Sequence, residues 1–93
     1  MLEINFLEKA EKFIKKLNKS DKKLSKQIVK KIVELQSNPI PLTSKSITNY
    51  FPFRRIRIGK YRVIYRYDET ILYITIINKR EAIYKDLNKL LKL

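Results

Sequence analysis

The sequence predicts an α+β fold: an N-terminal helical hairpin packed on a small twisted antiparallel β-sheet, followed by a short C-terminal helix. Up to about residue 37, apolar residues recur every three to four positions, which is the period of an amphipathic helix. From residue 53 the period changes to two, which is typical of strands. With 93 residues and 44% apolar content, the chain is expected to form a single domain spanning residues 1–93.

Two helices are predicted in the first part of the chain. Residues 5–18 place one apolar stripe on a helix: Phe6, Ala10, Phe13, Ile14 and Leu17. Asn5 followed by Glu8 is typical of a capping-box start. A second helix is predicted from Ser20 until residues 37–39, where the Ser-Asn-Pro sequence ends the pattern. Its apolar face consists of Leu24, Ile28, Ile32 and Leu35.

The rest of the chain predicts a sheet with a helical tail. In residues 1–4, apolar and polar side chains alternate as in a short strand. Residues 36–52 contain all three prolines and are predicted to form a loop, which is either a binding element or a crossover from the helices to the sheet. Gly59 suits a tight turn with positive φ. Arg80 to Leu93 has the apolar spacing of a short helix that docks on the domain or frays. The predicted antiparallel meander has three strands: Phe53 to Ile58, Tyr61 to Tyr67 and Ile71 to Ile77.

The amino-acid composition limits the functions that the protein can have. Lys and Arg number 22 against 9 Asp and Glu, which gives a net charge of +13 and points to a polyanion or an acidic partner. The absence of Cys and His removes disulfides, thiol catalysis and the commonest metal ligand, so no metal or other cofactor is expected. No apolar run reaches the roughly 18 residues of a membrane span, and three early glutamates, Glu3, Glu8 and Glu11, argue against a signal peptide. We therefore expect a cytoplasmic protein without a membrane partner.

The arginines concentrate in one stretch. Residues 35–67 contain no Asp or Glu, and strand alternation gathers four guanidiniums on one exposed sheet face: Arg55, Arg57, Arg62 and Arg66. Lys60 lies in the adjacent turn, while Arg54 falls on the apolar side and receives no role. Surface ion pairs rarely contribute more than about 1 kcal/mol, so stability does not explain this face. Guanidinium forks bind phosphate well, which favours RNA binding, although a surface for an acidic protein remains an alternative.

Two runs carry a family resemblance. The sequence RIRIGKYRVIY at residues 55–65, followed by ITIINKREAIY at residues 74–84, resembles the signature of the RelE/ParE toxin superfamily of type II toxin-antitoxin systems. A RelE-like member implies a metal-independent endoribonuclease that cuts mRNA in the A site of the 30S ribosomal subunit, where a ribose 2′-hydroxyl attacks the adjacent phosphate. The positions implied as catalytic are Arg62, Arg80 and Tyr84. The positions expected to bind RNA are Arg55, Arg57, Arg66 and Lys60.

The resemblance also implies a partner and leaves some roles open. The partner is a RelB-like antitoxin with an acidic segment, and one assembly it allows is a toxin-antitoxin heterotetramer. Fixed guanidiniums can stabilise a phosphorane, whereas Tyr84 would act as a base or stack on the nucleotide. Many members carry a histidine where Lys79 stands, so the general base and acid are left open. The alternatives are a ParE-like DNA gyrase inhibitor and a non-enzymatic nucleic-acid-binding module, and the arginines with the tyrosine favour the nuclease.

Overall fold

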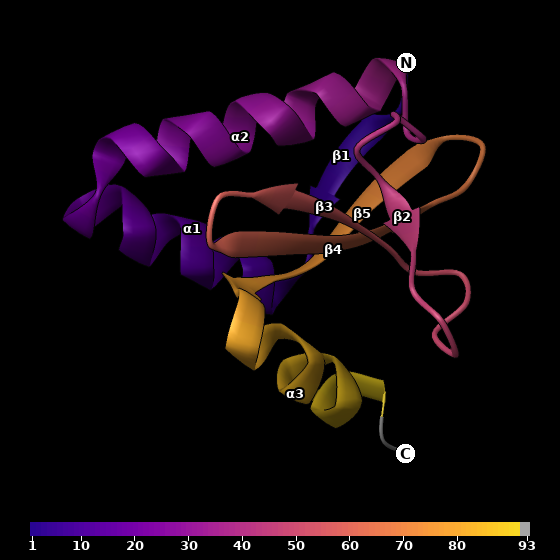
Figure 1. Ribbon diagram of the computed structural model, residues 1–93. Coiled ribbons are helices and arrows are strands. Elements are labelled where there is room, and N and C mark those ends of the chain that lie inside the picture. Colours follow the sequence, from indigo (N-terminus) through magenta and orange to yellow (C-terminus); the bar gives the residue numbers. More distant parts are fainter. Residues whose placement is uncertain (92–93) are drawn as a thin grey trace.

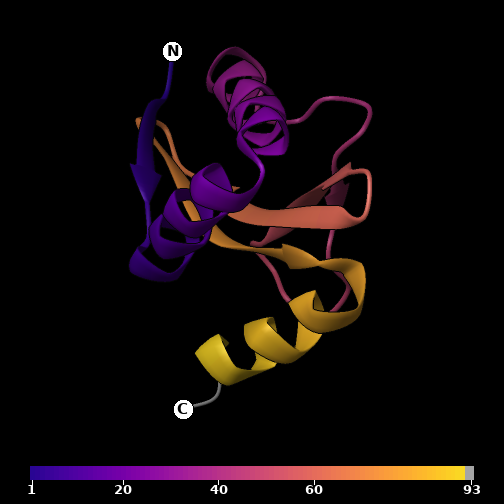
Figure 2. The same cartoon turned by 90° about the vertical axis from the view of Figure 1, so that its left-hand side faces the viewer.

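The computed structural model describes residues 1–91 as a five-stranded sheet with helices on both faces (Figure 1). A hairpin of α1 and α2 covers one face, and α3 lies on the opposite side (Figure 2). The α+β class and this order of hairpin, sheet and C-terminal helix are confirmed. None of the helices in the described part is long and apolar enough to cross a membrane. The elements are β1 (Glu3–Phe6), α1 (Glu8–Ser20), α2 (Lys22–Ser37), β2 (Lys45–Ser46), β3 (Arg54–Ile58), β4 (Tyr61–Tyr67), β5 (Ile71–Lys79) and α3 (Arg80–Leu91).

The sheet is larger than the predicted meander, and its order is β1-β5-β4-β3-β2. Strands β3, β4 and β5 pair antiparallel as expected, and β2, which lies in the predicted loop, pairs antiparallel with β3. In contrast, β1 pairs parallel with β5, from Glu3 opposite Ile71 to Phe6 opposite Ile74. The sheet is therefore mixed. The first strand runs from Glu3 to Phe6, two residues later than predicted, because pairing with residues 71–74 of β5 fixes its register.

Both predicted helix starts are displaced. Asn5 lies in β1, so the proposed capping box is wrong; the N-cap of α1 is Leu7, and no side chain caps it. Glu8 and Glu11 instead place negative charge at the positive end of the α1 dipole. The cap of α2 is Asp21, whose Oδ1 accepts a hydrogen bond from the Leu24 amide at 3.1 Å. The predicted cap, Ser20, is the last residue of α1.

The main core lies between the hairpin and the sheet. The inward alternation predicted for β3 and β4 is confirmed, since Ile56, Ile58, Val63 and Tyr65 all pack there. On β5 the alternation is broken by a bulge: Ile64 lies opposite Ile76 but Tyr65 lies opposite Ile74, so Thr75 is an extra residue. Because of the bulge, both Ile74 and Ile77 face this core.

A second, smaller core lies on the arginine-bearing face. Ile64 of β4 and Ile76 of β5 are fully buried there under α3 and the loop before β3. The expectation that this face is exposed is therefore wrong for much of its area. The apolar stripe of α3 covers the two isoleucines, so the tail docks on the domain over its described length. Residues 92 and 93 of the predicted tail helix lie outside the described residues. The second core consists of Ile47, Phe53, Ile64, Ile76, Ile83 and Leu87.

The loop between α2 and β3 is tied to the sheet by a buried hydroxyl. Tyr65 donates to the Pro39 carbonyl at 2.6 Å, and its hydroxyl lies 2.6 Å from Ser44 Oγ. Arg54 donates from Nε to the same Ser44 oxygen at 2.9 Å, which gives this arginine a structural role that the sequence did not reveal. Burial raises the pKa of Tyr65, and hydrogen bonding with Ser44 and Arg54 partly offsets the shift.

Removal of the Tyr65 hydroxyl is expected to destabilise the fold. Tyr65→Phe should lower the free energy of unfolding by about 1–3 kcal/mol, because the half-buried Pro39 carbonyl loses its donor and Ser44 keeps only Arg54 as a partner. Tyr67→Phe is the matched control, since the Tyr67 hydroxyl has no hydrogen-bond partner within residues 1–91, and it should stay within about 0.5 kcal/mol of wild type. Urea denaturation measures both variants. Equal effects would contradict this assignment.

Candidate functional site

The candidate site is built around the turn between β3 and β4. Gly59 has φ of +58°, which confirms the predicted left-handed turn. The turn sets the register so that Arg57 lies directly opposite Arg62, while Arg55 lies opposite Ile64. Because alternate residues share a face, Arg55, Arg57 and Arg62 project from the same side of the sheet.

The start of α3 is fixed against this turn. The Arg80 amide donates to the Lys60 carbonyl at 2.8 Å, so the first residue of α3 lies beside the β3–β4 turn. Tyr84 follows one helical turn later and therefore shares a side of α3 with Arg80. The Tyr84 side chain is 41% exposed, which leaves it accessible to a ligand.

Arg62 lies at the centre of the site and is nearly buried, with 7% of its surface exposed. Its Nη1 donates to the carbonyls of Gly59 at 3.1 Å and Tyr61 at 3.0 Å. Burial lowers the pKa of Arg62, and the neighbouring charges of Arg57, Arg55 and Arg80 lower it further, whereas Tyr84 acts in the opposite direction. An arginine remains ionised despite such a shift. The folded protein therefore holds a crowded cation at a free-energy cost.

No acidic side chain compensates this charge. All ion pairs within residues 1–91 use lysines, and none includes an arginine of the site. Of the Arg62 nitrogens, only Nη1 has a hydrogen-bond partner in the described part of the chain, so the other donors are available to a ligand. Several guanidiniums converging without a counter-ion can bind a phosphate and stabilise negative charge that develops on it. We name Arg55, Arg57, Arg62, Arg80 and Tyr84 the arginine site.

The structure separates one predicted residue from the others. Arg66 shares the face of Arg62 but lies toward the far end of β4, where its guanidinium stacks 3.9 Å from the ring centre of Tyr73. Lys60 is exposed on the turn beside the site. The predicted set therefore divides into the convergent arginine site, an adjacent Lys60 and a distant Arg66.

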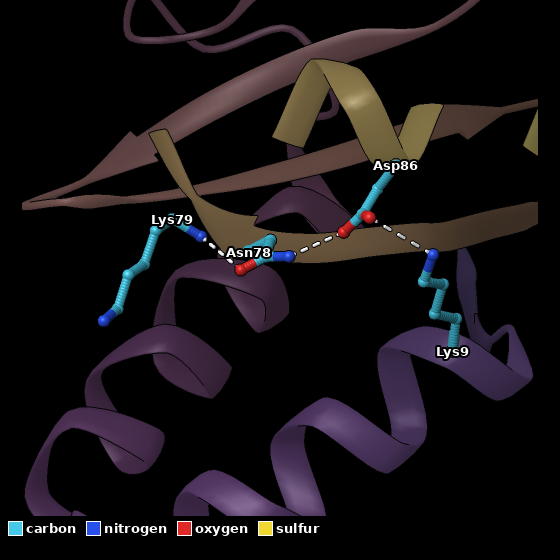
Figure 3. Close-up of polar contacts among 4 residues, drawn as sticks. All are labelled: Lys9, Asn78, Lys79 and Asp86. Atoms are coloured by element: carbon cyan, nitrogen blue, oxygen red, sulfur yellow. Dashed lines mark hydrogen bonds and ion pairs between the residues drawn. The ribbon is translucent and has the colours of Figure 1, made fainter. Parts of the chain in front are cut away.

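A polar network that the sequence prediction missed positions α3 (Figure 3). Asn78, at the end of β5, donates from Nδ2 to Asp86 Oδ2 at 2.6 Å, and its Oδ1 accepts from the Lys79 amide at 2.7 Å. Lys9 of α1 lies 3.4 Å from the other Asp86 oxygen. Asp86 thus joins α3 to β5 and α1.

This network predicts a pH dependence of stability. Burial disfavours the charged form of Asp86, but the Asn78 amide and the cations Lys9 and Lys89 outweigh burial and hold the pKa of that carboxyl below its usual value. A lowered folded-state pKa stabilises the fold above the unfolded value of about 4, and this contribution is lost as the pH falls through the folded value.

Asp86→Asn should therefore reduce the loss of stability between neutral and acidic pH. Thermal unfolding midpoints across that range measure the difference. Glu69→Gln, at an exposed residue without an ion pair in the described part, is the control and should follow wild type. Identical pH profiles for Asp86→Asn and wild type would contradict the assigned role.

Comparisons with known proteins are consistent with this geometry. The sequence matches the family described as "ParE toxin of type II toxin-antitoxin system, parDE" over residues 4–84. No curated protein is similar enough in sequence to match the chain. Among residues 1–91, no group of three acidic, His or Cys side chains could hold a metal ion.

Several solved structures share the fold. The YoeB dimer from Staphylococcus aureus is 20% identical with a TM-score of 0.75, and the match covers 85% of this chain and 97% of that one. The RelB-RelE antitoxin-toxin complex from Methanococcus jannaschii gives 24% identity, a TM-score of 0.68, and coverage of 92% and 98%. The DinJ-YafQ complex from E. coli gives 15% identity, a TM-score of 0.68, and coverage of 90% and 99%. At these identities the likeness shows the fold alone.

Proposed function

Since the chain belongs to the ParE toxin family of type II toxin-antitoxin systems, we propose that it is a toxin that cuts mRNA in the ribosomal A site. The observation that carries this proposal is the nearly buried Arg62, crowded by other arginines and by Tyr84 with no acidic counter-ion. A site kept cationic at a cost in stability is suited to an anionic ligand. A reaction at phosphate uses that charge directly, because negative charge increases in its transition state.

The proposed reaction needs no metal. A ribose 2′-hydroxyl loses its proton and its oxygen forms a bond to the adjacent phosphorus. The bond from phosphorus to the following 5′-oxygen breaks and that oxygen takes up a proton, which yields a 2′,3′-cyclic phosphate and a 5′-hydroxyl. Arg62 and Arg80 stabilise the phosphorane formed on the way. Arg55 and Arg57 hold neighbouring phosphates, and Lys60 and Arg66 bind the RNA farther from the reacting atoms.

Cleavage is proposed to depend on the ribosome because the arginine site has few groups that could orient the RNA strand. Tyr84 is the one aromatic residue of the arginine site, so the site by itself offers a single ring on which to stack and orient a flexible RNA strand. Attack by a 2′-hydroxyl requires the nucleophile and the leaving oxygen to lie roughly in line with phosphorus. An mRNA already held in the decoding centre of the 30S subunit would supply that alignment.

The proposed partner is an acidic RelB-like antitoxin. The net charge of +13 and the uncompensated arginine site favour a partner rich in Asp and Glu. DinJ with YafQ and RelB with RelE are toxin-antitoxin complexes among the structures that share the fold. An antitoxin segment over the arginine site would block phosphate binding, and two copies of each chain would form a heterotetramer.

One observation favours a second candidate. The matching family is described by its ParE toxin of the parDE system, and the resemblance to ParE-like members implies inhibition of DNA gyrase. Two assays on the same protein preparation distinguish the nuclease from the gyrase inhibitor. The first measures mRNA cleavage on translating ribosomes, with the same mRNA free of ribosomes as the control, and the second measures DNA supercoiling by gyrase. We expect cuts on ribosomes alone and unaffected supercoiling. Inhibited supercoiling without mRNA cuts would replace the nuclease with the gyrase inhibitor.

The Tyr84 hydroxyl is expected to take part in proton transfer. Tyr84→Phe should slow cleavage on ribosomes by about 100-fold, because it removes the hydroxyl and keeps the ring. Tyr73→Phe is the control; that tyrosine lies under Arg66 away from the site, and the change should leave the rate within about threefold. If Tyr84→Phe cuts as fast as wild type, the ring acts by stacking and the hydroxyl has no catalytic role.

A further inference from the structure

The helical hairpin carries a second concentration of positive charge. Helices α1 and α2 hold ten lysines, and four of them, Lys9, Lys12, Lys15 and Lys31, form ion pairs with carboxylates. Five of the others gather where the two helices join, and all five are exposed. We call these the tip lysines: Lys16, Lys19, Lys22, Lys23 and Lys26.

The local structure does not explain these charges. Between residues 12 and 33 the only acid is Asp21, and its carboxylate is used to cap α2 through the Leu24 amide. Lys22 and Lys23 occupy the first turn of α2, which contains no acidic residue, and there they oppose the positive end of the helix dipole. Lys22 and Lys26 add a like-charge pair at i,i+4 spacing. Only Lys19, in the last turn of α1, is placed favourably for its helix.

The tip lies at the same end of the molecule as the β3–β4 turn, which borders the arginine site. A shallow hollow at this end is lined by Lys16 of α1 together with Tyr61 and Lys79 of the sheet. A second hollow brings Leu24 of α2 beside Gly59 in the β3–β4 turn. Figure 1 shows the α1–α2 turn and the β3–β4 turn at the same side of the molecule. A nucleic acid that runs from the arginine site past the β3–β4 turn can therefore reach the hairpin tip.

We propose that the tip lysines form a second nucleic-acid-binding surface, which holds the sugar-phosphate backbone of double-helical RNA beside the strand bound at the arginine site. The proposal deepens the proposed function and rests on it for the choice of RNA as the polyanion. Lysine ammonium groups are compact charges that contact phosphates without a fixed geometry. They suit the regular backbone of a duplex, which proteins recognise mostly through its phosphates, 2′-hydroxyls and shape.

Single-stranded RNA and an acidic protein fit the tip less well. Unpaired bases need stacking surfaces, but the nearby rings of Phe13 and Tyr61 pack edge to face at 5.8 Å and join the main core. A protein interface usually has an apolar centre and few lysines. Of the large apolar side chains exposed within residues 1–91, none lies between residues 13 and 26. The tip therefore offers charge without apolar anchors.

The test compares two triple variants with the same change in net charge. The tip variant carries Lys22→Gln, Lys23→Gln and Lys26→Gln. The control carries Lys12→Gln, Lys15→Gln and Lys31→Gln, which removes three ion-paired lysines from the same two helices. A fluorescent, blunt-ended RNA duplex is titrated with each protein at several salt concentrations, and thermal unfolding is measured in parallel.

We expect the tip variant to bind the duplex at least tenfold more weakly and to reduce the slope of log affinity against log salt by about two to three. The control should stay within about threefold of wild type. The tip variant should unfold at or above the wild-type temperature, because substitution relieves repulsion with the α2 dipole. Equal weakening in both variants would overturn the proposal, since it would show a response to net charge alone. Unchanged duplex binding with weakened antitoxin binding would also overturn it and assign the tip to a protein.

Failure of the proposed function can be recognised separately. Arg62→Ala leaves the tip intact and should retain duplex binding while losing cleavage. If wild type cuts no mRNA but the tip variant still loses duplex binding relative to the control, the RNA-binding surface stands without the nuclease.

Discussion

Arg62→Ala is expected to lower the rate of mRNA cleavage on translating ribosomes by about 100- to 1000-fold, the usual cost of removing one group that stabilises an oxyanion. Arg62 is nearly buried, surrounded by Arg55, Arg57 and Arg80, and held by the turn carbonyls of Gly59 and Tyr61. Its position is therefore fixed before the substrate arrives, and no neighbouring guanidinium can replace it without moving. Rates come from single-turnover cleavage of a defined mRNA on stalled ribosomes.

Arg66→Ala is the matched control for this variant. Both arginines lie on β4 and on the same face, and both changes remove one positive charge, but Arg66 stacks on Tyr73 away from the site. We expect Arg66→Ala to retain the cleavage rate within about fivefold, with an effect mainly on RNA affinity. Circular dichroism should show both variants folded. Equal losses of rate would mean that the positive face acts as a whole and that Arg62 has no special role.

Leu87→Ala is expected to have the second large effect, on stability and cleavage together. Leu87 is fully buried and fixes α3 on the second core, against Ile64 and Ile76. Truncation of a buried leucine leaves a cavity and usually costs about 2–5 kcal/mol. Since Arg80 and Tyr84 are carried by α3, we also expect slower cleavage at temperatures where the variant remains folded. Chemical denaturation and ribosome cleavage measure the two effects.

Leu90→Ala is the control on the same helix. Leu90 is 45% exposed, and its truncation should change stability by no more than about 0.5 kcal/mol and leave cleavage unchanged. If Leu87→Ala destabilises the protein but cuts at the wild-type rate while folded, the docking of α3 is not needed to position the site.

Much of the arginine site could be predicted from the sequence, because strand alternation is a local rule. Arg55, Arg57 and Arg62 lie on the same face of the sheet because they belong to a short hairpin, and the turn of this hairpin is fixed by the only glycine, Gly59. The helical stripe of α1 and α2 is equally local, and its inward face is confirmed by the main core. The roles of Arg80 and Tyr84 were suggested by the family resemblance; the structure places Arg80 beside the turn and Tyr84 one helical turn farther along α3, on the same side of that helix.

Other features depend on contacts between distant parts of the chain. The parallel pairing of β1 with β5 joins the first residues to residues 71–74, which no local pattern reveals. The hydrogen bonds that Ser44 forms with Tyr65 and Arg54 also join residues that are distant in the sequence. The face with the arginines was predicted to be exposed because alternation assigns residues to faces but does not show what covers them. The buried Ile64 on that face was the signal that a covering element was needed.

The most direct test of the central claim is to compare two mRNAs on ribosomes stalled at the cleaved codon. One mRNA carries ribose throughout, and the other has a single 2′-deoxynucleotide at the position that supplies the attacking hydroxyl. The arginine site is proposed to stabilise a phosphorane formed by that hydroxyl, so we predict cleavage of the first mRNA to a 2′,3′-cyclic phosphate and no cleavage of the second. Equal cleavage of both mRNAs, or no cleavage of either by the folded wild-type protein, would contradict the account.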